Sequence, residues 1–220
     1  MYTLSIADAV AAVRKNLDEQ GLNESVMYGD ENADNDSLDS IISKTLPEAV
    51  NDIHAAAPAY LLEGREITEF KTCGFDNRVF FFTFDADCLR VAAFQANDSD
   101  MVVTEVIPEA SAEGRKQLNK WIRGTYDNPR LVQMQGETYL PSFRYYSLKD
   151  ETYKDNPKAA IRQLRIIDNL TWSEKDTEYK VSTDLRDSII YQLTALVCRI
   201  YGKADAADYF FNKAIKWKTS

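Results

Sequence analysis

The chain has 220 residues, with 26 Lys and Arg against 35 Asp and Glu, a single His and three Cys. A chain of this length can bury a full core without metal or disulfide support, as one domain or as two small ones. A single His excludes most His-based chemistry, because a zinc site or a facial triad built on imidazoles generally needs two or three of them. The net charge of -9 argues against a broad grip on nucleic acid, because that requires an excess of Lys and Arg on at least one face.

The N-terminal residues do not resemble a secretion signal, because they lack a basic segment and include Asp8. The longest apolar block, 79–84, is far shorter than the roughly 20 residues of a membrane-spanning helix. Cys73, Cys88 and Cys198 form no C-x-x-C pair, as expected of small buried hydrophobic residues in a reducing compartment. We therefore expect synthesis in a cytoplasm and no membrane span.

Apolar residues at helical spacing predict two helices in the first sixty residues. The first covers 6–17, with Ser5 as its N-cap and Gly21 as its stop. The second covers 36–57, where the following proline disfavours further helix. Pro47 lies inside this second pattern and predicts a kink or a break.

The middle of the chain changes to the composition of strands, rich in aromatic and β-branched residues. The strands are expected over 65–70, 78–84, 88–96, 101–107, 131–135, 138–146 and 161–167. The run 78–84 carries apolar residues on both faces, which predicts a strand buried on both sides. Pro141 predicts an edge position for 138–146. A short helix is expected over 111–121.

The last forty residues again show helical spacing. Apolar stripes over 185–200 and 204–215 predict a helical hairpin, with Ser182 or Thr183 as N-cap and Gly202 just after the first helix. No single stripe can be buried alone, so the terminal helix pairs are expected to pack together. The predicted fold is α+β: a helical bundle of 1–64 plus 183–220, with a β-rich insertion over 65–182.

The acidic run that begins at Asp30 partly resembles a calcium-binding loop. Asp30, Asn32 and Asp34 supply oxygens at the first three ligand positions of such a loop. Asn35 then stands where glycine should make the turn, and Ile41 where a bidentate Glu should close the site. A solvated loop between two helices fits this run better.

Other patterns predict no catalytic, cofactor or metal site. Asp85 and Asp87 resemble a turn that hydrogen-bonds its own backbone more than a cation site. His54 lacks a recognisable nucleophile or orienting partner, which favours a satisfied or exposed helix residue. Gly202-Lys203 is the single Gly-Lys pair and lacks the remainder of a phosphate loop. We therefore expect that the protein is not an enzyme and that it needs no cofactor.

Three segments resemble tailed-phage head-to-tail connector proteins. Residues 185–210 resemble the closing helix pair of that group, an amphipathic helix followed by a Gly turn and an Ala-rich helix. The segments 6–10 and 46–58 are similar to its opening helices. The pattern resembles the adaptor or ring proteins of podovirus-like necks (the tail tubular protein A type), including those of crAss-like phages.

This resemblance implies a structural virion protein that forms a homo-oligomeric ring of twelve copies between portal and tail. Its partners would be its own copies, the portal protein and the neighbouring neck or tail rings. DNA would pass through without specific binding, and a lumen lined mainly by Lys and Arg would contradict this. One alternative is an intracellular interaction or regulatory protein of a mobile element. Another is a small ligand-binding domain with a pocket among the strands over 80–94.

Overall fold

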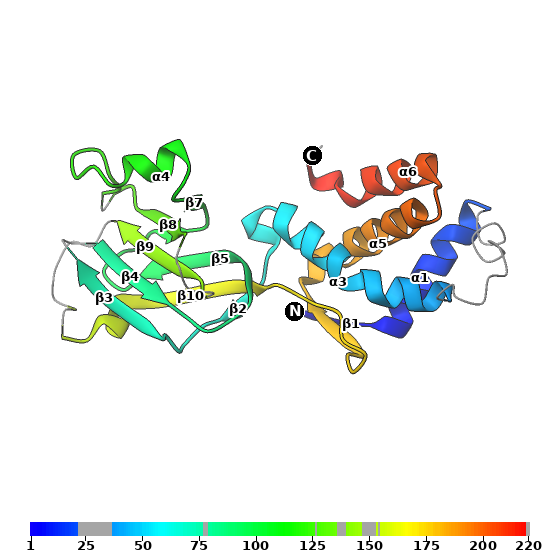
Figure 1. Cartoon of the computed structure of the whole chain (residues 1–220), viewed down its shortest axis with the longest axis horizontal. Helices are drawn as coiled ribbons and strands as arrows, with labels where there is room; N and C mark the ends of the chain where they lie inside the picture. Colours follow the sequence, from blue (N-terminus) through cyan, green and yellow to red (C-terminus); the bar gives the residue numbers. More distant parts are fainter. Residues whose placement is uncertain are drawn as a thin grey trace. The chain divides into compact units, whose positions relative to one another are not determined.

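The computed structural model describes residues 1–21, 37–76, 79–125, 127–135, 140–146, 153 and 155–218. The chain divides into two compact units (Figure 1). Unit 1 combines both ends of the chain, Met1–Glu63 and Leu170–Ser220, and unit 2 is the continuous stretch Gly64–Asn169.

The described part of unit 1 contains four α-helices, three of which pack against the fourth, α5. They are α1 (Ile6–Glu19), α3 (Leu38–Ala56), α5 (Arg186–Ile200) and α6 (Ala204–Ala214). Helix α5 contacts each of the other three, and α1 also contacts α3 (Figure 1). Leu193 and Val197 of α5 are fully buried, as are Val13 of α1 and Val50 of α3. The apolar stripes of the four helices therefore form a shared core.

The predicted ends of these helices are mostly confirmed. Ser5 caps α1, and its hydroxyl accepts a hydrogen bond from the Asp8 N–H at 3.0 Å. After α5, Gly202 has a φ of 69°. Its N–H donates to the Arg199 carbonyl, while the Lys203 N–H donates to that of Cys198, a Schellman closure. Of the kink or break predicted at Pro47, the break does not occur, because α3 is continuous from Leu38 to Ala56.

Unit 1 also holds a two-stranded sheet that the sequence did not predict. Strand β1 (Tyr2–Ser5) pairs antiparallel with β11 (Glu178–Val181), so that Leu4 lies opposite Tyr179. Leu4 and Val181 are completely buried. This sheet links the first residues of the chain to the segment that leads into α5.

Unit 2 consists of two sheets and the short helix α4 (Ala112–Lys116). The first sheet has the order β2 (Arg65–Glu66), β10 (Ile161–Asp168), β5 (Cys88–Ala96) and β6 (Val102–Val103). The second has the order β3 (Thr72–Asp76), β4 (Val79–Thr83), β9 (Ser142–Tyr146), β8 (Arg130–Met134) and β7 (Val106–Pro108). All neighbours are antiparallel except β7 and β8.

Phenylalanine rings fill the core of unit 2. Phe82 of β4 stacks on Phe94 of β5, with ring centroids 5.2 Å apart, and thereby joins the two sheets. It also stacks on Phe80 and on Phe143 of β9. The strand β4 faces this core through Phe80 and Phe82, and its opposite face carries Phe81, which is half-buried. The prediction that this strand is buried on both sides is therefore confirmed for the face with Phe80 and Phe82, whereas the face with Phe81 is only half-buried.

The predicted architecture of terminal helix pairs around a β insertion is wrong. Within the described residues the fold is mixed α+β, with five helices and eleven strands in three sheets. The helices are not confined to the two ends, because α4 lies between strands β7 and β8. The terminal region also contains the β1–β11 sheet. Short strands of four residues show too few alternations to be recognised, which explains why these were missed.

Three details of the middle region also differ from expectation. Strand β9 lies in the centre of its sheet, because Pro141 comes just before its first residue and removes no ladder hydrogen bond. The expected strand over 65–70 is reduced to β2, and the expected helix over 111–121 to α4. Among the described helices, none has both the length and the apolar character needed to cross a bilayer.

Candidate functional site

The described residues that the sequence offered as candidates belong to different units. His54 is buried in unit 1, where its Nε2 accepts a hydrogen bond from the Ser182 N–H at 3.4 Å. Burial lowers the pKa of this imidazole to about 4. Asp85 and Asp87 belong to unit 2, where Asp85 forms an ion pair with Lys71 at 3.1 Å. The acidic run from Asp30 to Asp36 lies outside the described residues.

Asp87 has a structural partner in its own unit. Its carboxylate accepts a hydrogen bond from the Asn169 side-chain amide at 3.3 Å, and its carbonyl accepts from the Asn169 N–H at 2.9 Å. No group of three His, Cys, Asp or Glu side chains suited to a metal occurs among the residues described. The described residues therefore do not support the hypothesis that Asp85 and Asp87 bind a cation.

The three cysteines also differ in their surroundings. Cys198 is buried in α5, and burial raises the pKa of its thiol to about 11. Cys73 and Cys88 are half-buried, and burial with the nearby Asp168 and Asp87 carboxylates raises the pKa of Cys88 to about 12. Thiols held in this protonated form are weak nucleophiles.

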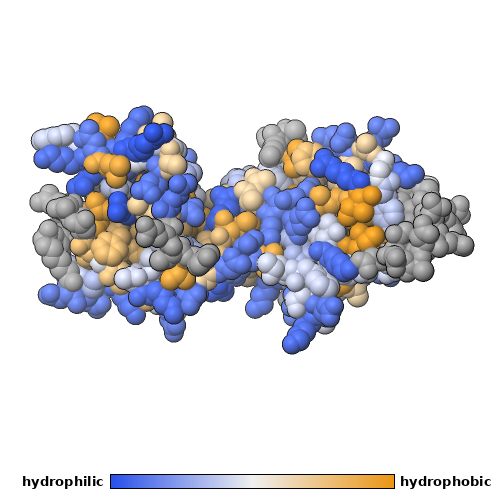
Figure 2. Space-filling model, in the orientation of Figure 1, coloured by the Kyte–Doolittle hydropathy of each residue, from blue (hydrophilic) through white to orange (hydrophobic). Residues whose placement is uncertain are grey.

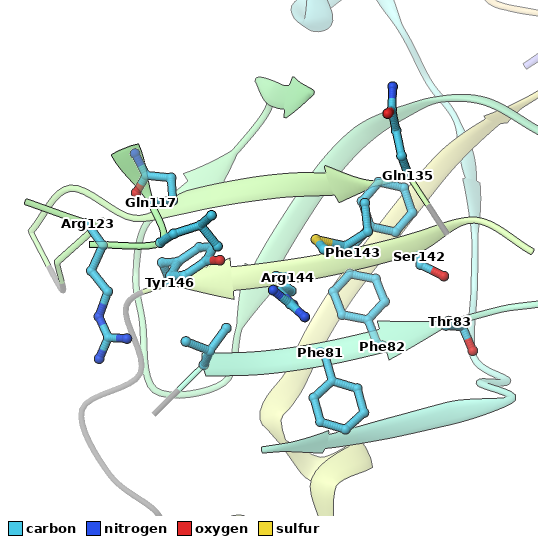
Figure 3. Close-up of a pocket in the computed structure, with 13 residues that line it drawn as sticks. Phe81, Phe82, Thr83, Gln117, Arg123, Gln135, Ser142, Phe143, Arg144 and Tyr146 are labelled. Carbon is cyan, nitrogen blue, oxygen red and sulfur yellow. The ribbon is translucent and has the colours of Figure 1, made fainter. Parts of the chain in front are cut away.

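A pocket of about 450 Å³ lies on the outer face of the five-stranded sheet in unit 2 (Figure 3). Alternate residues of β4 and β9 form its floor, because side chains two positions apart share one face of a strand. Its floor residues are Val79, Phe81 and Thr83 from β4 and Ser142, Arg144 and Tyr146 from β9, with Met134 from β8. Arg144 lies opposite Phe81 in the strand register. The Phe81 ring in turn lies over Gly74 of β3, where a Cβ would be 2.7 Å from the ring.

The segment that follows α4 forms the other wall of the pocket, through Gln117, Leu118 and Arg123. Gln117 is 2% exposed. Its side-chain oxygen accepts a hydrogen bond from the Gly124 N–H at 2.7 Å, and its amide donates to the Glu113 carbonyl at 3.3 Å. These two bonds tie the turn 117–124 to α4. The wall is therefore held in place by a buried side chain rather than by a long helix.

Gly114 anchors α4 against the strand region. A Cβ at this position would lie 2.3 Å from the Pro108 carbonyl oxygen and 2.8 Å from that of Glu109. Both are backbone atoms, so a side chain can be accommodated only if α4 shifts. The Ser111 hydroxyl supports the same junction, since it accepts from the Gly114 N–H and donates to the Pro108 carbonyl.

We expect Gly114→Ala to destabilise unit 2 by about 1–3 kcal/mol, the usual cost of overpacking. Urea unfolding measures the loss, and hydrogen exchange at the Gly124 amide should become faster because the wall moves with α4. Arg115→Ala, at the exposed neighbouring position, is the matched control and should change neither quantity appreciably. Equal behaviour of the two variants would show that α4 is not tightly seated.

The charge of the pocket differs from that of the whole chain. The described residues that line it include Arg123 and Arg144 and no acidic residue, although the chain has 35 acidic and 26 basic residues. Arg144 is half-buried, and its guanidinium makes no hydrogen bond or ion pair with any described residue. In Figure 3 its side chain lies in the middle of the floor. The pocket is thus a cationic hollow in an acidic protein.

The same turn also presents an apolar knob, which we define as Leu118, Trp121 and Ile122. Their side chains are 61%, 83% and 58% exposed. The Lys120 ammonium lies 4.9 Å from the centre of the Trp121 ring.

The segment around the knob is also basic. Residues 111–130 carry five basic and two acidic residues, a net charge of +3, so the other 200 residues carry -12. Figure 2 shows hydrophobic and hydrophilic atoms next to each other over this part of unit 2.

Unit 1 exposes large apolar side chains on the α5–α6 pair. Ile200 at the end of α5 is 56% exposed, and Tyr209 of α6 is 43% exposed. The Lys213 ammonium lies 4.5 Å from the centre of the Tyr209 ring. Each unit therefore exposes large apolar side chains, and in each unit a Lys ammonium lies near the ring of one of them.

Sequence reasoning offered a pocket among the strands over 80–94 as an alternative, but it did not identify the lining residues of β8, β9 and 117–123, and it missed the knob. The alternation in β9, with Arg144 between the buried Phe143 and Tyr145, marks an outward-facing arginine. It does not reveal that residues 117–123 lie against the same face. No model of a known protein family matches the chain, and a comparison with curated proteins gives no match either.

Proposed function

We propose that this chain is a structural protein of a tailed-phage neck or tail. In this proposal it forms a twelve-fold ring between portal and tail and is part of the conduit for DNA ejection. The observation that carries the proposal is the exposure of large apolar side chains on both units: the apolar knob of unit 2, and Ile200 and Tyr209 of unit 1. Exposed apolar groups bordered by polar residues are typical of protein–protein contacts.

A ring places a specific demand on such surfaces. Each copy repeats one head-to-tail contact, so one chain must carry two different surfaces that complement each other. The two apolar surfaces belong to different units and contain different residues. They therefore suit a contact in which one unit of a copy meets the other unit of the next copy.

The charge distribution is compatible with a DNA conduit. Outside residues 111–130 the chain carries -12. Carboxylates that line a channel leave DNA phosphates without binding partners, whereas a basic lining would retain them. In the proposed ring, DNA passes without specific binding, and the basic segment serves protein contacts.

Size-exclusion chromatography with light scattering tests the proposal, first with the protein alone and then with the portal protein of the same genome. The expected result is a ring-sized assembly in at least the second sample, with a closed ring in negative-stain images. A monomer or dimer in both samples would overturn the proposal. It would favour the alternative of an interaction or regulatory protein of a mobile element.

Trp121→Ser is expected to weaken this assembly by roughly thirtyfold or more, because buried tryptophans at interfaces commonly contribute about 2 kcal/mol or more. Tyr60→Ser is the matched control, since Tyr60 is an 80% exposed aromatic residue that belongs to unit 1 and is not part of the knob. Neither change should alter the free energy of unfolding by more than about 0.5 kcal/mol. If both variants assemble like the wild-type chain, the knob does not form a ring contact.

The second candidate function is ligand binding, which the pocket on the five-stranded sheet specifically favours. This function and assembly would involve the same segment, because the apolar knob projects from the turn that forms the pocket wall. Leu118 belongs to both the wall and the knob.

A further inference from the structure

We propose that the pocket in unit 2 is a binding site for an oxyanion, a carboxylate in particular, joined to a flat apolar group. Arg144 would bind the oxyanion, and the rings and aliphatic side chains of the floor would contact the apolar group. This inference does not depend on the ring, because it rests on residues of unit 2 alone.

The first argument is charge. The described lining residues include two arginines and no carboxylate, in a chain where acidic residues outnumber basic ones. Among the described residues, surface ion pairs elsewhere in unit 2 join Arg65 to Asp168, Lys71 to Asp85 and Lys116 to Glu113. Arg144 has no such acidic neighbour in the described part of the chain. A pocket with this lining attracts an anion and repels a cation.

The second argument is the state of the Arg144 guanidinium. It carries five N–H donors that face carboxylates and phosphates in a two-pronged geometry. The residue is half-buried, and none of its donors is used by a described residue. Partial removal of a charge from water costs free energy unless a counter-charge compensates for it. A bound carboxylate would provide both the counter-charge and two hydrogen-bond acceptors.

The third argument is the surface next to Arg144. Phe81 lies opposite it on β4, and Tyr146 lies two residues further along β9 on the same face. Met134 and Val79 add aliphatic surface to the lining. Flat apolar groups pack well against aromatic rings, and guanidinium groups stack on them. The volume of about 450 Å³ lies within the range of small-ligand pockets and accommodates one ring with its acidic substituent.

Polar groups at the rim can define the orientation of the ligand. The Ser142 hydroxyl donates to the Leu140 carbonyl at 3.3 Å, which leaves its oxygen able to accept. Thr83 shares a hydrogen bond of 2.7 Å with Thr72. The chemistry that this site recognises is therefore a carboxylate on an apolar body. The source can be a free small molecule or an acidic side chain beside an apolar one on another protein chain.

Benzoate is a suitable probe, because it joins one carboxylate to one flat ring, and benzamide is its uncharged counterpart. The chain has four methionines, so methyl NMR can follow Met134 in the pocket and Met101 outside it, with Met134→Leu to assign the signal. We expect benzoate to shift the Met134 methyl signal in a saturable way, with a dissociation constant of about a millimolar. Met101 should not respond, and benzamide should shift Met134 at least tenfold more weakly.

Arg144→Gln should weaken benzoate binding by roughly tenfold or more, because it removes the charged hydrogen-bond donors. Arg162→Gln is the matched control, an exposed arginine of β10 in the same unit that is not among the lining residues. The unfolding midpoint of Arg144→Gln should stay within a few degrees of the wild-type value, which separates lost binding from lost folding. No shift at Met134, or equal binding by the Arg144 and Arg162 variants, would overturn the proposal.

A second arm distinguishes the two sources of the carboxylate. Assembly is measured with and without saturating benzoate, using the same light-scattering assay. Loss of assembly with benzoate identifies the occupant as an acidic side chain of a neighbouring copy. Unchanged assembly together with the Met134 shift identifies a free small molecule. An absent ring with intact benzoate binding would contradict the proposed function alone.

Discussion

Replacing Phe82 by alanine is expected to lower the free energy of unfolding of unit 2 by about 3–5 kcal/mol, the cost of large core truncations. Phe82 is fully buried and contacts four other rings: it stacks on Phe80, Phe94 and Phe143 and meets Phe70 edge-on at 6.0 Å. Its removal would leave a cavity between two sheets whose other rings are held by their strands. Ring pairs of this geometry add stability beyond the area that they bury.

Urea unfolding followed by circular dichroism measures this effect in the full chain. Phe82→Leu is the first control, because it retains most of the buried volume and should cost about 1 kcal/mol. Tyr60→Ala is the second, since an 80% exposed side chain outside unit 2 should change stability by less than about 0.5 kcal/mol. A loss below about 1 kcal/mol for Phe82→Ala would mean that the rings do not form a tightly packed core.

Helices in this chain could be predicted because their signals are local. The stripe over 6–17 together with Ser5 defines α1 within its own sequence, and Gly202 marks the end of α5 in the same way. Hydrogen bonds from a cap or a Schellman closure join residues only a few positions apart. The burial of each helix then follows from its apolar face.

The architecture could not be predicted, because it depends on pairings between distant residues. Strand β1 becomes a strand only through β11, almost the whole chain away, and four residues carry little periodicity. The predicted edge position of the strand over 138–146 is wrong for a related reason. The strand β9 begins one residue after Pro141, so the proline blocks no pairing and β9 has a neighbour on both sides.

The candidate site shows the same limit. The alternation around Arg144 in β9 indicates that this arginine faces away from the core. That the turn 117–123 covers this face depends on Gln117 and on the close approach of Gly114 to β7. Neither residue has a local sequence pattern that points to β9. The chemistry of the pocket therefore becomes visible only in three dimensions.

Acidification is expected to lower the free energy of unfolding, and the second large effect arises in this way from the single histidine of the chain. His54 is 2% exposed, and burial lowers the pKa of its imidazole from 6.5 to about 4. Its Nε2 accepts a hydrogen bond from the Ser182 N–H. A protonated Nε2 cannot accept this bond and would place a charge in an apolar interior. The folded state therefore holds the neutral imidazole, whereas the unfolded chain takes up a proton near pH 6.5.

The sign of the effect follows from this difference. Well above pH 6.5, His54 is neutral in both the folded and the unfolded chain, so its titration takes nothing from the free energy of unfolding. Between pH 6.5 and about 4 the unfolded chain binds more protons, so stability falls as the pH falls. From about pH 7.5 to about pH 5 this single group should cost about 2 kcal/mol in the free energy of unfolding.

His54→Gln tests this directly, because glutamine offers the Ser182 N–H an oxygen acceptor but does not titrate. Urea unfolding at the two pH values should show about 2 kcal/mol less acid sensitivity in the variant than in the wild-type chain. Carboxylates contribute equally to both chains and cancel in the comparison. The single imidazole also gives one set of ring proton signals, whose NMR titration reports its pKa without assignment. Titration near 6.5 with equal acid sensitivity of the two chains would show that the imidazole is open to water.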